Sequence, residues 1–438
     1  MSKKNIFLFL CFFILFAYPI SADEYHNQQV LVGEKAAGLG GTFVGIGDGA
    51  EACYYNPAGL TQLKISYLSV SSQIFEYKAI KGKFLADSKE KLTSLSFVPS
   101  FWGMAKDAGE YKFGFSIVVP EYDAYKMHEQ YSDLQMGSII FNNIRVDQVS
   151  NDQTYLIGPS IAKILNPRFS LGFTVYFRYL DIANRDTYYY KASDSVSELR
   201  AENNSENSGK GLGGMGVVGF LYKPADKINI GLTFKTGSQI SNTIDIIERN
   251  YTYTASLGST SGKFNNYYLE KQVSYTSIVP PSFILGLKWE ADKKLCFATD
   301  ITYMFPVGYD KEIYQLNLSL KDYEKKISRV EINEVINLNF GSEYMLDNNV
   351  PFRFGFFTDR STAPKVKDNG TSQPMHIDNY GISVSSGILS QNSSMIFGIK
   401  YGWGSGRMTN LDFSSGNIVV DKVKSVNYAF NLSGSYNF

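Results

Sequence analysis

Five basic side chains of this chain are placed to bind an acidic group. Each lies in a run of alternating residues, on the side of the run that carries small or polar side chains. The five are Arg178, Lys235, Lys288, Arg353 and Lys400. A carboxylate in a low-dielectric interior needs a cation or several hydrogen-bond donors. Two acids, Asp300 and Glu343, share the same side of their own runs. The cations are therefore candidates for one or two contacts to a ligand headgroup, or for ion pairs within the protein.

The sequence offers little for bond-making chemistry, and no cofactor is expected. The histidines are His26, His128 and His376. They are far apart and lack paired spacing, which leaves a metal site unsupported. No Ser/His/Asp or Cys/His grouping carries a signature, so an enzyme is disfavoured. Gly211, Gly213 and Gly216 match G-x-G-x-x-G, but they follow a polar segment and open no helix. Glycines that face a lumen and admit another segment explain them better.

Strands are the elements that must position these side chains. Residues 169–179 alternate a large apolar side chain with a small or polar one, and so do residues 228–235, 395–403 and 426–438. A period of two with one apolar face is typical of a strand between lipid and a lumen. The fourteen predicted strands are 64–77, 92–105, 111–120, 151–164, 168–181, 212–223, 227–243, 278–289, 294–306, 334–345, 351–359, 377–389, 393–404 and 425–438.

Composition and strand number together predict a barrel in a membrane. Aromatic residues make up 15% of the chain and charged residues 19%. After the first residues, no stretch approaches the roughly 18 consecutive apolar residues of a membrane helix. A closed barrel is the other structure that satisfies its backbone in lipid, and an even strand number brings the last strand back to the first. We therefore expect an all-β, 14-stranded antiparallel transmembrane β-barrel in the outer membrane.

The connections between predicted strands alternate in length. Short ones, such as 165–168, 223–227, 290–293, 346–350 and 390–393, are typical of periplasmic turns. The three longest are 121–150, 182–211 and 244–277, which we expect to be loops that cover the outer mouth.

The first residues have the pattern of a secretory signal peptide. Lys3 and Lys4 precede an apolar run, and Ser21 and Ala22 form a small-residue cleavage site, so residues 1–22 are predicted to be removed. A lipoprotein cysteine at Cys11 is disfavoured because it lies within the apolar run. Loss of two lysines leaves 40 basic against 42 acidic residues, from 42 of each in the full chain. This balance gives no reason to expect a nucleic acid as partner.

Residues 36–60 cannot form a core of their own. The segment reads AAGLGGTFVGIGDGAEACYYNPAGL and holds seven glycines, which lose much conformational freedom on ordering and bury no side chain. It needs a container, and the strands after residue 63 can supply one. We expect residues 23–63 to form a plug inside the lumen and residues 64–438 to form the barrel.

The motif Asn56-Pro57-Ala58 and the glycines before it resemble the N-terminal hatch of the long-chain fatty acid transporter family (FadL and its aromatic-hydrocarbon relatives). The resemblance covers residues 33–63 best and includes Pro280, Pro281 and the strand that follows. It departs at Cys53, where a serine or alanine is expected. A final strand that ends in Phe438 also resembles the C-terminal signature of outer-membrane barrels.

The resemblance implies a monomeric channel for passive uptake of long-chain fatty acids or aromatic hydrocarbons. Ligand would pass from the outer loops to an apolar pocket above the plug, and Gly40, Gly41 and the Asn-Pro-Ala motif would shift as it moves. The motif could equally make a simple turn before the first strand. An alternative function is a barrel that serves as shuttle or anchor in protein secretion, and a weaker one is a general porin.

Prolines predict a weak place in the wall. Pro99 and Pro159 fall inside predicted strands on either side of the third strand, which we expect to end at Pro120. Proline cannot donate to a strand ladder. The three prolines therefore either form a seam through which an apolar ligand leaves sideways into the bilayer, as family members are thought to allow, or occupy harmless bulges.

Two cysteines, Cys53 and Cys296, remain after the predicted cleavage. They are either free thiols or a disulfide that ties the plug to the wall in an oxidising compartment.

Overall fold

The computed structural model describes residues 25–26, 30–83, 90–136, 139–195, 197–256, 262–317, 322–347, 349–412 and 415–438. Most of them lie in antiparallel strands. The strands are β1 (Tyr67–Gly82), β2 (Glu90–Ala108), β3 (Tyr111–Tyr131), β4 (Leu134–Met136), β5 (Ile139–Asn166), β6 (Phe169–Ser193), β7 (Ser197–Ala225), β8 (Ile228–Lys235), β9 (Ser238–Ser256), β10 (Gly262–Val279), β11 (Ser282–Glu290), β12 (Leu295–Met304), β13 (Val307–Asn317), β14 (Asp322–Ile332), β15 (Val335–Asp347), β16 (Val350–Asp359), β17 (His376–Leu389), β18 (Ser393–Asp412) and β19 (Asn417–Asn437).

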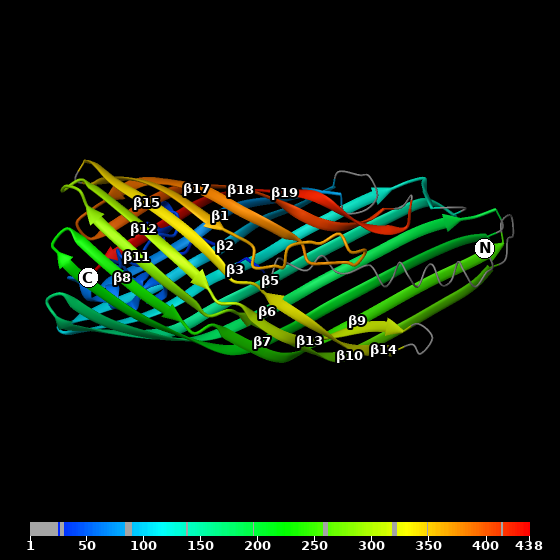
Figure 1. Cartoon of the computed structure of the whole chain (residues 1–438), viewed down its shortest axis with the longest axis horizontal. Coiled ribbons are helices and arrows are strands. Elements are labelled where there is room, and N and C mark those ends of the chain that lie inside the picture. The colour runs from blue at the N-terminus through cyan, green and yellow to red at the C-terminus, as the bar shows by residue number, and fades with distance from the viewer. Residues whose placement is uncertain are drawn as a thin grey trace.

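The strands close into a barrel (Figure 1). Neighbours pair in chain order, with β8 beside β11 and β12 beside β15, and β19 pairs back with β1 from Tyr67↔Asn437 to Lys81↔Lys424. Beyond Gly237 and Pro280, β9 and β10 continue β8 and β11 outward. When a strand and its outward continuation are counted as one strand, the described barrel has fourteen strands. This number confirms the predicted fold class. No described helix has the length and apolar character needed to span a membrane.

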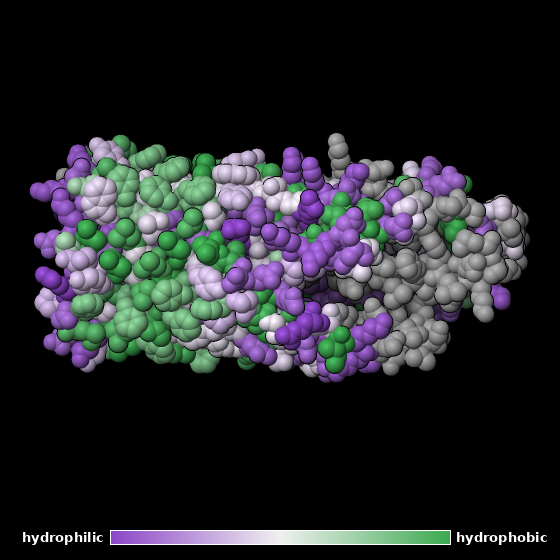
Figure 2. Space-filling view, viewed as in Figure 1, coloured by the Kyte–Doolittle hydropathy of each residue, from purple (hydrophilic) through white to green (hydrophobic). Residues whose placement is uncertain are grey.

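Side chains alternate between the two faces of the wall, as the sequence pattern predicts. Along β11, Phe283, Leu285 and Leu287 are each about two-fifths exposed, whereas Ile284 and Lys288 are buried. Exposed apolar side chains of many strands gather in a band around one end of the barrel (Figure 2). This band surrounds the end with the short turns, where a bilayer would meet the wall.

The three segments predicted as long outer loops are mostly strand, so this prediction was wrong. Of the described residues in these ranges, most of those in 121–150 extend β3 and β5, most of those in 182–211 extend β6 and β7, and those in 244–277 belong to β9 and β10. Pro120 likewise lies inside β3 and does not end it. The physical reason is that these extensions lie beyond the apolar band, where the outer face meets water and no longer needs apolar residues. The apolar alternation used to find strands is therefore missing from these extensions.

Residues 30–63, here called the inner segment, lie inside the barrel near its short-turn end (blue in Figure 1). The segment contains the short helices α2 (Glu34–Gly38), α3 (Ala52–Tyr55) and η1 (Pro57–Gln62). Its apolar side chains are almost fully buried and pack with Phe101, Val118 and Tyr176 of the wall. The largest hydrophobic core therefore lies between the inner segment and the wall. The predicted signal peptide lies outside the described residues.

Candidate functional site

Six glycines that pair across neighbouring strands bring wall backbone into direct contact with the inner segment, and Gly114 of β3 does so outside these pairs, beside Cys53 Sγ. A Cβ built on any of the six would lie 2.0–2.8 Å from an atom of the inner segment, closer than real Cβ atoms come. The six pair directly across neighbouring strands as Gly172↔Gly219, Gly231↔Gly286 and Gly341↔Gly355. We call these six the glycine ring. The glycine ring was not predicted from the sequence. Its trace in the sequence is one inward-facing glycine in each of these six strands.

Asn56 joins the inner segment to the wall. Its side chain is fully buried, and Nδ2 donates to the carbonyl oxygens of Val44 (2.9 Å) and Phe220 (3.0 Å). Its Oδ1 accepts from the Ala58 N–H (3.1 Å) and so caps η1. Pro57 begins η1, where a missing N–H leaves no bond unmade. The Asn-Pro-Ala motif therefore makes specific contacts with β7 besides turning the chain.

Gly40 and Gly41 make a tight loop against the opposite side of the wall. Both have left-handed backbone, with φ of 67° and 82°. The Gly40 N–H donates to Ser383 Oγ (3.0 Å). Nearby, one carboxylate oxygen of Asp300 accepts from the N–H groups of Phe43 (2.8 Å) and Val44 (3.0 Å). Asp300 thus binds inner-segment backbone rather than a wall cation.

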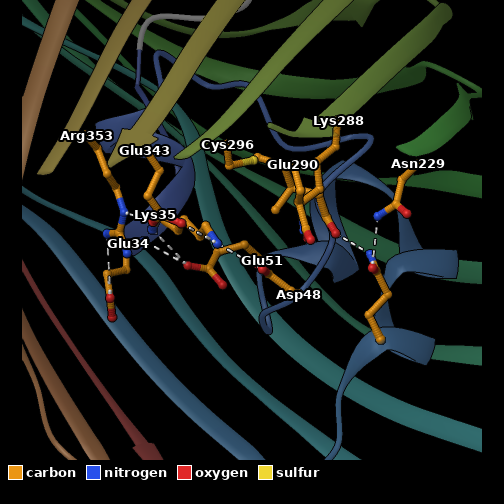
Figure 3. Close-up of polar contacts among 12 residues, drawn as sticks. Glu34, Lys35, Asp48, Glu51, Asn229, Lys288, Glu290, Cys296, Glu343 and Arg353 are labelled. Carbon is orange, nitrogen blue, oxygen red and sulfur yellow. Dashed lines mark hydrogen bonds and ion pairs between the residues drawn. The ribbon is translucent and has the colours of Figure 1, made fainter. Parts of the chain in front are cut away.

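A buried ion network holds α2 against β15 and β16 (Figure 3). Lys35 Nζ lies 2.9 Å from Asp48 and 3.2 Å from Glu343, and Glu343 also accepts from Arg353 Nε at 2.6 Å. Arg353 Nη1 is 3.9 Å from Glu34. Burial disfavours the ionised form of Asp48, but the Lys35 ammonium beside it lowers the pKa of that carboxyl to about 2.

The structure separates the five candidate cations into two groups. Lys288 lies 2.8 Å from Glu290, Arg353 lies 2.6 Å from Glu343, and Lys400 lies 3.4 Å from Glu76. These three are therefore committed to acids of the protein. Sequence alternation gives the side of a strand on which a residue lies, but not the residue that meets it there.

Arg178 and Lys235 differ from the other three. Arg178 is 2% exposed, and its Nη2 donates to Ser277 Oγ at 3.0 Å. Its Nε and Nη1 donate to no atom of the described residues, and the nearest carboxylate, Glu121, is 3.7 Å from Nη2. Lys235 Nζ lies 3.5 Å from the ring centroid of Tyr54 in α3. Both cations face the lumen and lie beyond α3 in the direction of the outer mouth.

The ladder between β2 and β3 is interrupted. Pairing runs from Ala108↔Tyr111 to Phe101↔Val118 and resumes only at Thr93↔Lys126 in the described backbone. The register on both sides of the gap places Pro99 opposite Pro120. Since neither proline carries an N–H, the two strands lack donors at the same position. We call this stretch, residues 94–100 and 119–125, the seam.

Pro159 is not part of the seam. It pairs with Phe115 in the β3–β5 ladder, which is continuous apart from a bulge between Val118 and Glu121. The β5–β6 ladder instead lacks pairs at Gly158 and Pro159. The predicted three-proline seam therefore reduces to one interrupted ladder on the β2 side of β3 and a separate irregularity one strand away.

Most of this sequence matches one known protein family. Residues 23–404 match the family model described as outer membrane protein transport protein (OMPP1/FadL/TodX). The chain belongs to this family. The predicted resemblance to FadL is thereby confirmed, together with an outer-membrane location. At the level of sequence, no curated protein is similar enough to match.

Solved structures of FadL-family proteins share the fold. The Pseudomonas putida toluene transporter TodX has a TM-score of 0.63 at 12% identity, over 93% of this chain and 98% of that one. A Pseudomonas aeruginosa FadL homologue has a TM-score of 0.62 at 12% identity, over 94% and 100%. The Ralstonia pickettii toluene transporter TbuX has a TM-score of 0.58 at 13% identity, over 94% and 99%. None of these comparisons supports the alternative of a secretion shuttle or anchor.

The remaining motifs of this FadL-family chain have structural roles. Cys53 and Cys296 are both free thiols, so the disulfide alternative was wrong. A Cβ on Gly211 or Gly213 would meet Ile240 of β9, and one on Gly216 would meet Thr236. These glycines therefore accommodate the break between β8 and β9 and do not contact the inner segment. No cluster of His, Cys, Asp and Glu among the described residues could hold a metal ion.

Proposed function

We propose that this protein is a passive outer-membrane channel for hydrophobic molecules with an acidic headgroup, above all long-chain fatty acids. The observation that carries the proposal is Arg178, a buried guanidinium with two nitrogens that donate to no described residue. Burying such a charge without acceptors is costly. A ligand carboxylate would supply two oxygens that match the planar guanidinium. An aromatic hydrocarbon has no such acceptor, which makes it the less favoured substrate.

The tail of such a ligand would lie outward of Arg178. Leu180 and Ile182 are the next inward-facing residues of β6, and both pack with Ile240 of β9 in a buried apolar cluster. Lys235 would serve as a second cation near the headgroup, with its ammonium over the Tyr54 ring. The headgroup would thus point toward the inner segment and the chain toward the outer mouth.

Glu121 would link ligand binding to the seam. Its carboxylate is the nearest acid to Arg178, at 3.7 Å, and it accepts from Thr154 Oγ1 at 3.1 Å. It also directly follows Pro120. A bound carboxylate would replace Glu121 at Arg178 and so release the Glu121 side chain within the seam. The ligand would then leave sideways between β2 and β3 into the bilayer.

Movement of the inner segment would open the way along the lumen. Asn56 donates to β7 and Gly40 donates to β17, with Pro57, Ala58 and Gly41 beside them in the chain. These hydrogen bonds would exchange without unfolding the barrel. The process would need no bond chemistry and a single copy of the chain. Outer-membrane lipid would be the only other partner.

Uptake by cells tests this function. Cells that lack their own fatty acid transporter, but make this protein, should take up labelled long-chain fatty acid faster than cells with an empty vector. An Arg178→Gln variant made at equal level should restore little of that uptake. Mass spectrometry of lipids extracted from the purified protein should recover fatty acid. Extraction of hydrocarbons alone, or passage of sugars in liposome swelling, would contradict the proposal.

A further inference from the structure

The outer surface of the barrel carries a cavity between the start of β15 and the segment that follows β16. It has a volume of about 340 Å³ and is lined by residues of β12, β15, β17 and the segment 360–365. The ladder between β15 and β16 starts only at Asn339↔Phe357. Residues 335–338 thus lack a described strand partner on this side, which leaves room for the cavity.

Separate side-chain and backbone hydrogen bonds, rather than a regular ladder, join the start of β15 to the end of β16 and the segment after it. Leu338 N–H donates to Thr358 Oγ1 (2.8 Å), and Arg360 N–H donates to Asn337 Oδ1 (2.9 Å). The Asn333 N–H donates to the Thr362 carbonyl (2.7 Å). The lining of the cavity includes the exposed side chains of Glu334 and Ile336, so the cavity opens on the outer face, and we call it the notch.

The notch lies at the boundary between apolar and polar surface. Along the outward face of β15, Phe340, Leu338 and Ile336 are 40–50% exposed, and the next outward residue is the acid Glu334. Tyr303 and Phe305 stand beside it as an edge-to-face pair. Aromatic side chains of this kind mark the headgroup level of a membrane protein. An amphiphile in the bilayer would therefore have its chains on β15 and its headgroup in the notch.

The notch presents charges of both signs. Arg360 is half exposed, and its Nε is 3.9 Å from Asp378, which is too far for a hydrogen bond. Lys365 is exposed and forms no ion pair with a described residue. Glu334 accepts from the Tyr303 hydroxyl at 2.6 Å and keeps a second oxygen. Two cations for a phosphate and two carboxylates for an ammonium are thus within one cavity.

We propose that this notch binds the headgroup of a membrane lipid that carries both a phosphate and a primary ammonium, the phosphoethanolamine class. Arg360 and Lys365 would bind the phosphate, and Glu334 and Asp378 would accept from the ammonium. Each contact would be charge-assisted on both sides. The site faces outward, so it is independent of the transported ligand.

Native mass spectrometry of the full-length protein with defined lipids tests the assignment. The lipids share their acyl chains and carry phosphoethanolamine, phosphocholine or phosphoglycerol. We expect one phosphoethanolamine lipid to be retained about tenfold more tightly than the other two. Phosphoglycerol has no ammonium, and the quaternary ammonium of phosphocholine has no N–H to donate to Glu334 and Asp378. The double variant Arg360→Gln/Lys365→Gln should weaken all three, whereas Glu334→Gln should lower only the preference for phosphoethanolamine.

Arg329→Gln is the matched control, since Arg329 is an exposed cation of β14 that pairs with Asp310 outside the notch. It should leave retention unchanged. The proposal is overturned if the three lipids bind equally, or if the double variant binds like the control. Displacement of the lipid by soluble phosphoethanolamine at equal concentration would also overturn it. The contact of the acyl chains with the apolar residues of β15 would then contribute nothing to binding.

Discussion

Arg178 and Lys235 differ from the other inward cations in what lies beside them, not in their position along a strand. Arg353 and Lys400 are more than nine-tenths buried and lie next to acids. Arg178 is equally buried, but its nearest acid lies beyond hydrogen-bond distance. A buried guanidinium that keeps two nitrogens without an acceptor in the described part of the chain is a good candidate for an anionic ligand, even with an acid close by. This reasoning gives Glu121 the role of a competitor for the ligand headgroup.

Replacing Glu121 tests that role. In Glu121→Gln the amide oxygen can still accept from Thr154, but the negative charge near Arg178 is gone. We expect long-chain fatty acid to bind several-fold more tightly, with a lower dissociation constant by calorimetry. Glu198→Gln, which alters a partly exposed acid paired with Arg200 on β7, is the control. Equal affinity of the Glu121 variant and wild type would show that the two carboxylates do not compete.

The glycine ring makes a steric prediction. A Cβ on Gly231 would lie 2.0 Å from the Val44 carbonyl oxygen, whereas the nearest atom to a Cβ on Gly402 of β18 is 3.5 Å away. Gly231→Ala should therefore displace the inner segment and raise the single-channel conductance to ions. Gly402→Ala should behave like wild type. If the two variants conduct alike, the inner segment is not what seals the lumen.

Asp48 gives a pH dependence with a defined sign. Its pKa falls from the ordinary 3.8 to about 2 when the segment is docked. The stability that its ionised form contributes is present above pH 3.8 and is lost as the pH falls toward 2. We expect pepsin to cleave residues 33–48 of detergent-solubilised protein increasingly across this window. Asp48→Asn should be cleaved already at the upper end, and an unchanged pH profile in that variant would contradict the assignment.

At the level of elements, the positions of the wall strands could be predicted where one face of the strand meets lipid. Inside the apolar band the period of two is clear, and β6, β8, β11 and β19 lie where the sequence places them. Beyond the band both faces are polar, so the outer halves of β6 and β7 could not be distinguished from loops. The seam could be predicted in part, because proline has no backbone N–H in any surroundings. Its confinement to β2 and β3 depends on register, which the sequence does not display.

Restoring donors to the seam tests its part in release. The double variant Pro99→Ala/Pro120→Ala supplies two N–H groups at facing positions of β2 and β3. We expect slower hydrogen exchange of amides in residues 94–100 and 119–125, together with slower fatty acid uptake at unchanged binding affinity. Pro351→Ala, at the start of β16 and away from the seam, serves as control. Protected amides with normal uptake would remove the seam from the exit route.

At the scale of the whole molecule, the glycine-rich N-terminal stretch and the barrel explain each other. Seven glycines and few large side chains could not fold alone, and a barrel with a bare lumen would leave inward polar groups unpaired. Their union gives Asn56 and Asp300 buried partners far away in the sequence. That a segment would lie inside the wall could be inferred from composition. The strands that the segment would touch could not be inferred, because contacts across more than 150 residues leave no local pattern.

The most direct test of the central claim compares a long-chain fatty acid with its methyl ester. The two share an apolar chain, but only the acid offers a carboxylate to Arg178. We predict that wild-type protein binds the acid at least about tenfold more tightly than the ester, as expected for a charge-assisted pair. Arg178→Gln should bind both alike, at the affinity of the ester. Equal binding of acid and ester by wild type, or a preference that survives in Arg178→Gln, would contradict the account.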